Sequence, residues 1–341
     1  MQTLPWLLTR RFSVELWYTR VDATGKLGSL LVDASASIVH FAQTCFTLLE
    51  TRFDPEFGMS WAYMRPAGRP CFSPQLLLEL RRYIEDIVRN GQSPSDHVAG
   101  ERVIYAVLAS RTPRIFSLGG DLALFRNAIC HRDREQLRRY AQLCIDDLYP
   151  WNRNFDLPIT TISLVQGTAL GGGFEAALAS SVIVAEESAR MGFPEVLFNL
   201  FPGMGAYSFL KRKVGRRVTD ELITSGNVYT AKQLYDMGVV DVVAPDGTGE
   251  RAVYSYVRKH ARAGRGRRAY ERVRSDFEAV ERAELERITE IWVETAVRLE
   301  ERDLRMMDRL VRAQEKARTT PSFTGTSAQA RDLIAARSAA D

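Results

Sequence analysis

Two glutamates lie in apolar surroundings, where a surface carboxylate is not expected. Glu175 belongs to the stretch GGGFEAALA, and Glu195 stands between Pro194 and Val196 in the stretch MGFPEVLF. Burial disfavours the charged carboxylate and raises its pKa toward the range that suits proton transfer near neutral pH. Taken alone, Glu175 also fits a complement to a helix dipole, and Glu195 fits a helix N-terminal carboxylate after a proline. Together the two carboxyl groups predict acid–base chemistry.

Two glycine-rich segments accompany these glutamates. The first is FSLGGDL at residues 116–122, and the second is the triplet Gly171, Gly172 and Gly173, which follows an apolar stretch. Glycine lets the backbone approach a ligand closely, and a helix N-terminus offers N–H groups without intrahelical partners. Two such N–H groups would hold a carbonyl oxygen as it gains negative charge. Each donor would accelerate the reaction by ~10²–10³-fold. A glycine triplet alone is more often a turn, so this prediction depends on the nearby glutamates.

Alternating elements are predicted to position these groups. Apolar stretches of strand length alternate with amphipathic stretches of helical period, which is typical of an α/β fold with crossover connections. Strands are predicted at 12–18, 58–64, 102–108, 159–165, 182–185 and 241–243, and helices at 76–88, 122–129, 135–148 and 171–179.

The pattern changes after about residue 251. From there to residue 316 no strand signal is found, and apolar residues recur at helical spacing in 285–299 and 304–311. Residues 319–341 are mostly small and polar, which favours a flexible tail. We therefore divide the chain into a core at 1–255, a C-terminal helical segment at 256–318 and a tail at 319–341.

Composition excludes several other classes. The 341 residues are 45% hydrophobic with a formal net charge of +4, and the longest apolar run, 103–109, is too short to span a bilayer. The four cysteines form no C-x-x-C pair, and neither an H-E-x-x-H nor a G-x-S-x-G motif occurs. We expect a cytoplasmic protein without a signal peptide, metal, cofactor or membrane association. The basic run 258–274 fits a solvated face better than a binding patch, although a patch for an acidic carrier protein or for nucleic acid stays open.

The glutamates and glycines together resemble a known superfamily. Residues 116–122 resemble the first oxyanion segment of the crotonase (enoyl-CoA hydratase/isomerase) superfamily, and residues 165–207 resemble its central signature, including the spacing between Glu175 and Glu195. The resemblance implies a ClpP/crotonase-like spiral of ββα units followed by the helical segment. It also implies that the N–H groups of Gly120 and Gly172 are the oxyanion donors.

Three segments narrow the resemblance to one group within this superfamily. SLGGDLALF at 117–125, FPEVLFNLFPGMGAYSF at 193–209 and the helical stretch 288–314 are similar to RpfF-type synthases of diffusible signal factor. These crotonases make cis-2-unsaturated fatty acids for quorum sensing. The resemblance runs from about residue 70 to residue 314 and is weak over the variable residues 1–60. Apolar residues follow Asp121, where hydratases often carry a lysine, which favours an acyl carrier protein over CoA.

The resemblance implies a two-step reaction. A 3-hydroxyacyl thioester is dehydrated to a 2-enoyl thioester, and an activated water then hydrolyses the thioester. By hydratase precedent Glu195 takes the α-proton and Glu175 serves the hydroxyl group or water, and the two carboxyls should titrate as a coupled pair. Met204, Trp292 and Leu310 fall at acyl-pocket positions of the similar family, although an apolar stripe is more often plain core.

The resemblance also implies binding partners, and it leaves two alternative functions open. We expect a homo-oligomer, a trimer or a hexamer, with an acyl carrier protein (or CoA) thioester as substrate and a sensor kinase as a further candidate partner. No nucleic-acid partner is expected. The first alternative is an enoyl-CoA hydratase/isomerase of fatty-acid metabolism, which would leave the thioester intact. The second is a non-catalytic crotonase-fold binding protein, against which the presence of both glutamates argues.

Overall fold

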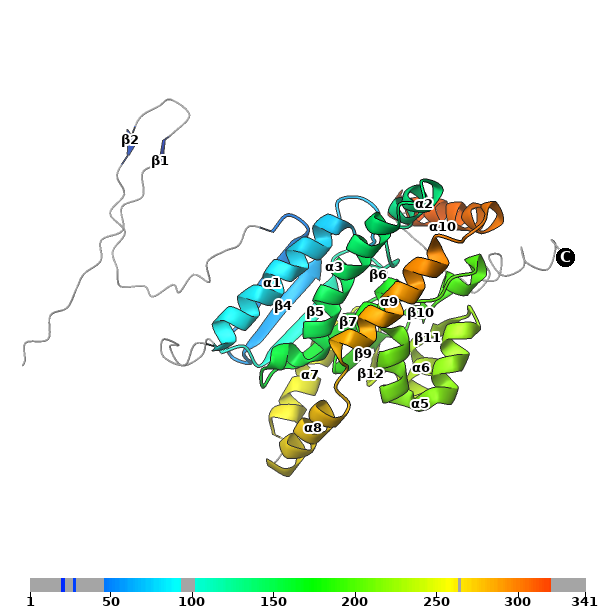
Figure 1. Ribbon diagram of the computed structural model, residues 1–341. Coiled ribbons are helices and arrows are strands. Elements are labelled where there is room, and N and C mark those ends of the chain that lie inside the picture. Colours follow the sequence, from blue (N-terminus) through cyan, green and yellow to red (C-terminus); the bar gives the residue numbers. More distant parts are fainter. Residues whose placement is uncertain (1–19, 22–26, 29–45, 93–101, 263–264, 320–341) are drawn as a thin grey trace, which may run out of the picture. The chain divides into compact units, whose positions relative to one another are not determined.

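The computed structural model describes residues 20–21, 27–28, 46–92, 102–262 and 265–319 (Figure 1). Residues 1–45 are one unit, in which β1 (Arg20–Val21) pairs with β2 (Leu27–Gly28) in antiparallel fashion. Residues 46–341 are a second unit, which holds every element described below. The strand predicted at 12–18 and the tail predicted after 319 lie outside the described residues.

A six-stranded sheet forms the centre of the second unit. Its strands run in the order β12-β9-β7-β5-β4-β3, and all neighbours are parallel except β3 and β4. The strands are β3 (Leu49–Asp54), β4 (Met59–Met64), β5 (Tyr105–Ser110), β7 (Thr160–Val165), β9 (Val182–Glu186) and β12 (Val242–Ala244). Five of these confirm predicted strands. Four of them differ from the predicted boundaries by one residue, and the strand predicted at 102–108 runs from Tyr105 to Ser110.

A second sheet of four short strands was not predicted. Its order is β11-β10-β8-β6, and only β10 and β11 are antiparallel. The strands are β6 (Ile115–Ser117), β8 (Thr168–Leu170), β10 (Arg190–Gly192) and β11 (Val228–Thr230). Three residues are too few to show a period of two, so no pattern signals them. Each of β5-β6, β7-β8 and β9-β10 places one strand in each sheet before a helix follows, which confirms the expected spiral of ββα units.

The central strands β4, β5, β7 and β9 of the large sheet are buried on both faces. Trp61 and Tyr63 of β4 face a small apolar cluster that α7 (Gly249–Ala261) covers, whereas Ala62 and Met64 face the main core. This alternation follows from the two-residue period of a strand. Parallel strands buried on both faces read as continuous apolar runs, which explains why the strand signals were clear.

Helices cover the main core. Figure 1 shows α1 (Pro74–Gln92), α3 (Arg134–Asn152) and α9 (Arg282–Ala296) side by side across one face of the large sheet. The remaining helices are α2 (Leu122–Cys130), α4 (Gly172–Leu178), α5 (Ala206–Thr224), α6 (Ala231–Asp236), α8 (Arg265–Phe277) and α10 (Glu301–Thr319), with 3-10 turns η1 (Asn154–Asp156) and η2 (Pro194–Phe198). All four predicted helices are confirmed.

The C-terminal segment packs onto this core. The described residues after 251 contain helices and no strand, as predicted. Arg138 of α3 makes two hydrogen bonds to the carboxylate of Glu290 on α9, at 2.6 and 3.0 Å. The paired donors fix the orientation of α9 on α3. The boundary predicted after residue 255 falls inside α7, and the division into core, helical segment and tail stays a prediction.

Candidate active site

All seven residues that the sequence singled out lie around one cavity. It encloses about 970 Å³, open solvent at its mouth included. These residues are the glutamates Glu175 and Glu195, the glycines Gly120 and Gly172, and the apolar residues Met204, Trp292 and Leu310. Their meeting requires α4, η2, the loop after β6, the loop before α5 and both C-terminal helices.

The backbone N–H groups of Gly120 and Gly172 lie near each other at the N-terminus of α4. Gly119 and Gly171 have φ values of +97° and +52°, in the region that favours glycine. Each therefore turns the chain just before Gly120 or Gly172. A side-chain carbon on Gly172 would lie 3.3 Å from the backbone nitrogen of Gly120. Within the described residues neither N–H has a hydrogen-bond acceptor, so the pair is available to a ligand oxygen.

Glu175 is held by backbone N–H groups at the start of α5 and in the loop before it. It lies in the first turn of α4 and is only 2% exposed. Its Oε1 accepts hydrogen bonds from the backbone N–H groups of Met204 at 2.8 Å and Ala206 at 3.0 Å. Burial raises the pKa of Glu175 to about 7, although these backbone donors favour the charged form. The carboxyl group is thus fixed in place and titrates near neutrality.

Glu195 lies in η2, directly after Pro194, and lines the cavity. A side chain on Gly171 would collide with its Oε1, so the glycine makes room for the carboxyl group. Its Oε2 has no hydrogen-bond partner among the described residues. Burial, together with the negative charge of Glu175, raises the pKa of Glu195 to about 8. Because each carboxylate disfavours ionisation of the other, the two titrate as a pair.

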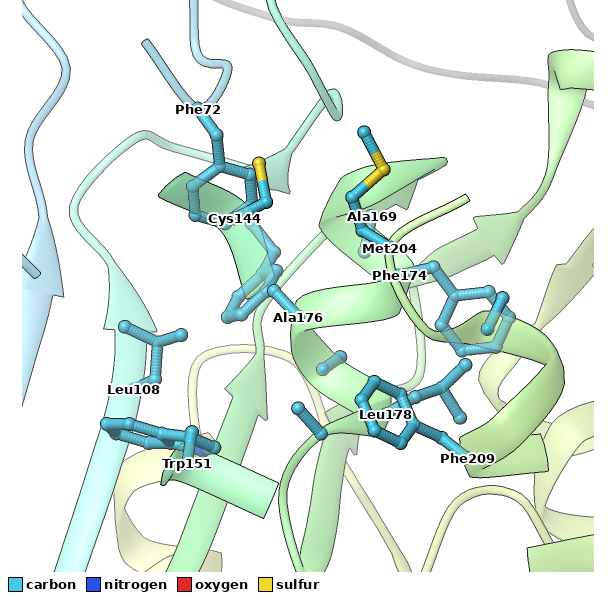
Figure 2. Close-up of a cluster of buried hydrophobic side chains, with 14 of the residues drawn as sticks. Phe72, Leu108, Cys144, Trp151, Ala169, Phe174, Ala176, Leu178, Met204 and Phe209 are labelled. Atoms are coloured by element: carbon cyan, nitrogen blue, oxygen red, sulfur yellow. The ribbon is translucent and has the colours of Figure 1, made fainter. Parts of the chain in front are cut away.

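The rest of the wall is apolar. Trp292 of α9 packs edge-on against Phe125 of α2, with the ring centroids 5.1 Å apart, and Leu310 comes from α10. Figure 2 shows Met204 within a cluster of buried side chains that includes Phe72 and Trp151. The structure brings the three predicted pocket residues to the cavity; their contact with an acyl chain stays a prediction.

A long part of the wall was missed by the sequence argument. Leu77, Leu80 and Ile84 of α1 line it, as do Tyr140, Cys144, Asp147, Leu148 and Trp151 of α3. Their three- and four-residue spacing is visible in the sequence, but it reads as an ordinary core face. Only the packing of α1 against α3 shows that these faces enclose a cavity.

The described residues carry no signs of two other kinds of site. Within these ranges, no group of three or more His, Cys, Asp or Glu side chains is arranged to hold a metal ion. No helix in the described part of the chain is long and apolar enough to cross a membrane.

Comparison with known proteins places most of the chain in one family. Residues 97–317 match the family model of enoyl-CoA hydratase/isomerase. The chain is 32% identical over 187 residues to enoyl-CoA isomerase/hydratase fer4 of Mycosarcoma maydis, which is 54% of this chain and 64% of that protein. It is 31% identical over 185 residues to 2,3-dehydroadipyl-CoA hydratase of Escherichia coli K12, which is 53% of this chain and 63% of that protein. Both alignments span less than two thirds of the relatives.

Solved structures share the fold. The human mitochondrial delta3-delta2-enoyl-CoA isomerase matches with a TM-score of 0.64 at 15% identity, over 79% of this chain and 98% of its own. Pseudomonas aeruginosa DspI matches with a TM-score of 0.56 at 22% identity, over 68% of this chain and 85% of its own. At these identities the likeness concerns the fold.

Proposed function

The chain belongs to the enoyl-CoA hydratase/isomerase family, and we propose that it adds or removes water across C2–C3 of an acyl thioester, with Glu175 and Glu195 as its acid–base pair. One observation carries this proposal. Two carboxyl groups whose pKa values lie near neutrality share a cavity with the two unpaired N–H groups of Gly120 and Gly172. Such a site stabilises an enolate and moves protons on either side of it.

The proposed dehydration proceeds as follows. The thioester carbonyl of a 3-hydroxyacyl substrate accepts hydrogen bonds from Gly120 and Gly172. Glu195 removes the proton at C2, and the electron pair moves toward the carbonyl oxygen. Glu175 then protonates the hydroxyl group at C3, which leaves as water while the C2–C3 double bond forms. Hydration is the same path in reverse.

A second candidate step follows from the C-terminal helices. The sequence segment that resembles signal-factor synthases, 288–314, contributes Trp292 and Leu310 to the cavity wall. The apolar wall supports a medium- or long-chain substrate. The resemblance supports a final hydrolysis, in which a water activated by a glutamate attacks the thioester carbonyl and the thiol leaves. The product would be a cis-2-unsaturated fatty acid for quorum sensing.

The proposal for the acyl carrier depends on Asp121 and the residues that follow it. The carboxylate of Asp121 accepts hydrogen bonds from Arg69 at 2.8 Å and from the N–H of Leu124 at 3.2 Å, so Asp121 caps α2. Apolar residues follow it, without the lysine that hydratases often carry there. This favours an acyl carrier protein over CoA. Self-association into trimers or hexamers and binding of a sensor kinase are part of the same proposal.

Mass spectrometry of the products tests the reaction. Purified protein is incubated with 3-hydroxydodecanoyl carrier protein, and separately with the CoA thioester. Enoyl thioester alone supports the hydratase, and free dodecenoic acid supports the additional hydrolysis. Both products should be lost in Glu175→Gln and Glu195→Gln and retained in Glu187→Gln, which makes the same change on the exposed surface. Turnover near that of the wild type in either site variant would refute the mechanism.

A further inference from the structure

An acidic residue lines the apolar cavity at a distance from the N–H pair. Tyr140, Cys144, Asp147 and Trp151 line the cavity along one face of α3. The Tyr140 hydroxyl marks the end near the N–H pair, because it accepts from the N–H of Asp121 at 3.2 Å. Asp147 lies seven residues further along the helix, or ~10 Å at ~1.5 Å per residue. An acyl chain that extends from the N–H pair along α3 therefore reaches Asp147.

One oxygen of Asp147 is unpaired. Its Oδ1 accepts from Nε of Arg81 at 2.9 Å, whereas its Oδ2 is buried and has no hydrogen-bond partner among the described residues. The residue is 6% exposed. Buried polar atoms without a partner are rare in folded proteins, and each requires an explanation. Nη2 of Arg81, on the same ion pair, is a second such atom, so this pair leaves hydrogen-bonding capacity unused beside the cavity.

The neighbours of Asp147 separate the cavity from the charged surface. Arg81 also lies 3.5 Å from Oδ2 of Asp146, which is in turn paired with Arg282 at the start of α9. Asp146 does not line the cavity, although it belongs to the same ion-pair network as Asp147. On the inner side, Leu80 and Ile84 of α1 line the cavity, so Asp147 is a polar position in the apolar wall at this end.

We propose that this end of the cavity is a subsite for a hydroxyl group at the distal end of the acyl chain. The preferred substrate is then an acyl thioester with a terminal hydroxyl. The inference rests on the proposed function for the thioester class and adds a substrate feature that the two glutamates do not determine. Asp147 is the specificity residue of this subsite.

A hydroxyl group suits the position better than a charged group. It donates to a carboxylate and accepts from a protonated carboxyl, so it fits either state of Asp147. Burial raises the pKa of Asp147 to about 7 despite the Arg81 charge, so both states occur near neutral pH. A terminal carboxylate would meet like charge, and a terminal ammonium would lose its hydration in an apolar cavity beside Arg81.

Binding measurements test the subsite without relying on turnover. Isothermal titration calorimetry compares saturated thioesters of acyl carrier protein from octanoyl to tetradecanoyl, each with a methyl end and with a terminal hydroxyl, and the same series on CoA. Saturated chains lack the groups that the dehydration consumes. At the length that reaches Asp147, we expect the hydroxylated chain to bind the wild-type protein about tenfold more tightly, or ~1.4 kcal/mol.

Three variants test whether Asp147 causes the preference for the hydroxylated chain. Asp147→Leu should abolish it, because no polar partner remains. Asp147→Asn keeps the shape and hydrogen-bonding capacity and should retain a preference, which also covers the case in which the leucine variant fails to fold. Asp146→Asn weakens the same ion-pair network outside the cavity and should leave the ratio unchanged.

The outcomes separate this subsite from the reaction. Equal or weaker binding of every hydroxylated chain, a preference that persists in Asp147→Leu, or no binding of either series overturns the subsite. Tighter binding of a chain with a terminal carboxylate also overturns it and assigns the end wall to Arg81. A hydroxyl preference without turnover of any thioester would refute the proposed function and leave the subsite standing.

Discussion

Replacing Glu195 by glutamine should stabilise the fold above neutral pH. Burial raises the pKa of Glu195 from its ordinary 4.5 to about 8. Between these values the unfolded chain releases a proton that the folded protein retains. The wild-type protein is therefore most stable below pH 4.5 with respect to this group, and it loses that stability as the pH rises toward 8. Glutamine does not titrate in this range, so the variant lacks this dependence of stability on pH.

The pKa interval sets the magnitude of this effect. At ~1.4 kcal/mol per pH unit, a rise from 4.5 to about 8 corresponds to an effect on the order of 5 kcal/mol. Part of it is shared with Glu175, whose charge disfavours ionisation of Glu195. We therefore expect Glu195→Gln to be more stable than the wild type by about 2–4 kcal/mol at pH 9, with a gain that shrinks toward pH 5.

Urea unfolding followed by circular dichroism measures this difference at a series of pH values from about 5 to 9. The comparison includes Glu187→Gln, which changes an exposed glutamate in the same way and should track the wild type throughout. The other carboxylates titrate in all three proteins, so their effect largely cancels in the difference. A difference that does not change with pH, or a glutamine variant that is less stable at pH 9, would refute the assignment of Glu195 as a buried carboxyl with a raised pKa.

Three further predictions concern the reaction. The pH dependence of kcat/KM should be bell-shaped with limbs near 7 and 8, because one of Glu175 and Glu195 must be ionised and the other protonated; a profile flat from about pH 6 to 9 would contradict the pairing. Gly172→Ala places a methyl group 3.3 Å from the nitrogen of Gly120, so kcat should fall by ~10²-fold with little change in Tm, and an unchanged rate would argue against these oxyanion donors. Trp292→Ala should cost ~3–5 kcal/mol of stability and shift turnover toward longer chains, and an unchanged chain-length profile would leave Trp292 as plain core.

The sequence was sufficient where function depends on short local stretches. Glu175 could be placed in a helical turn after a glycine triplet because the strand, the turn and the apolar helix follow one another directly. The glycines of 116–122 were found for the same reason. The central strands were predicted because burial on both faces leaves continuous apolar runs.

The sequence was insufficient where a property arises from packing between distant segments. Asp147 follows Asp146 in a helix, and nothing in the sequence distinguishes the buried carboxyl group from the one in the surface ion-pair network. The difference arises because α1 packs against that face of α3. Likewise, β8 is a strand only because β6 and β10 pair with its three residues.

The wall supplied by α9 and α10 also links the chemistry to the order of synthesis. Both glutamates, both N–H groups and the sheets lie before residue 250, yet Trp292 and Leu310 complete the cavity from the last helices. A chain emerging from the ribosome folds its N-terminal parts first. Until α9 docks on α3, water reaches the cavity from the side that Trp292 later covers, and burial cannot raise the pKa values of the glutamates to their final extent. Before α9 docks, the pKa values of Glu175 and Glu195 therefore lie closer to their ordinary range, so the proposed acid–base pair depends on helices outside the segment that carries the glutamates.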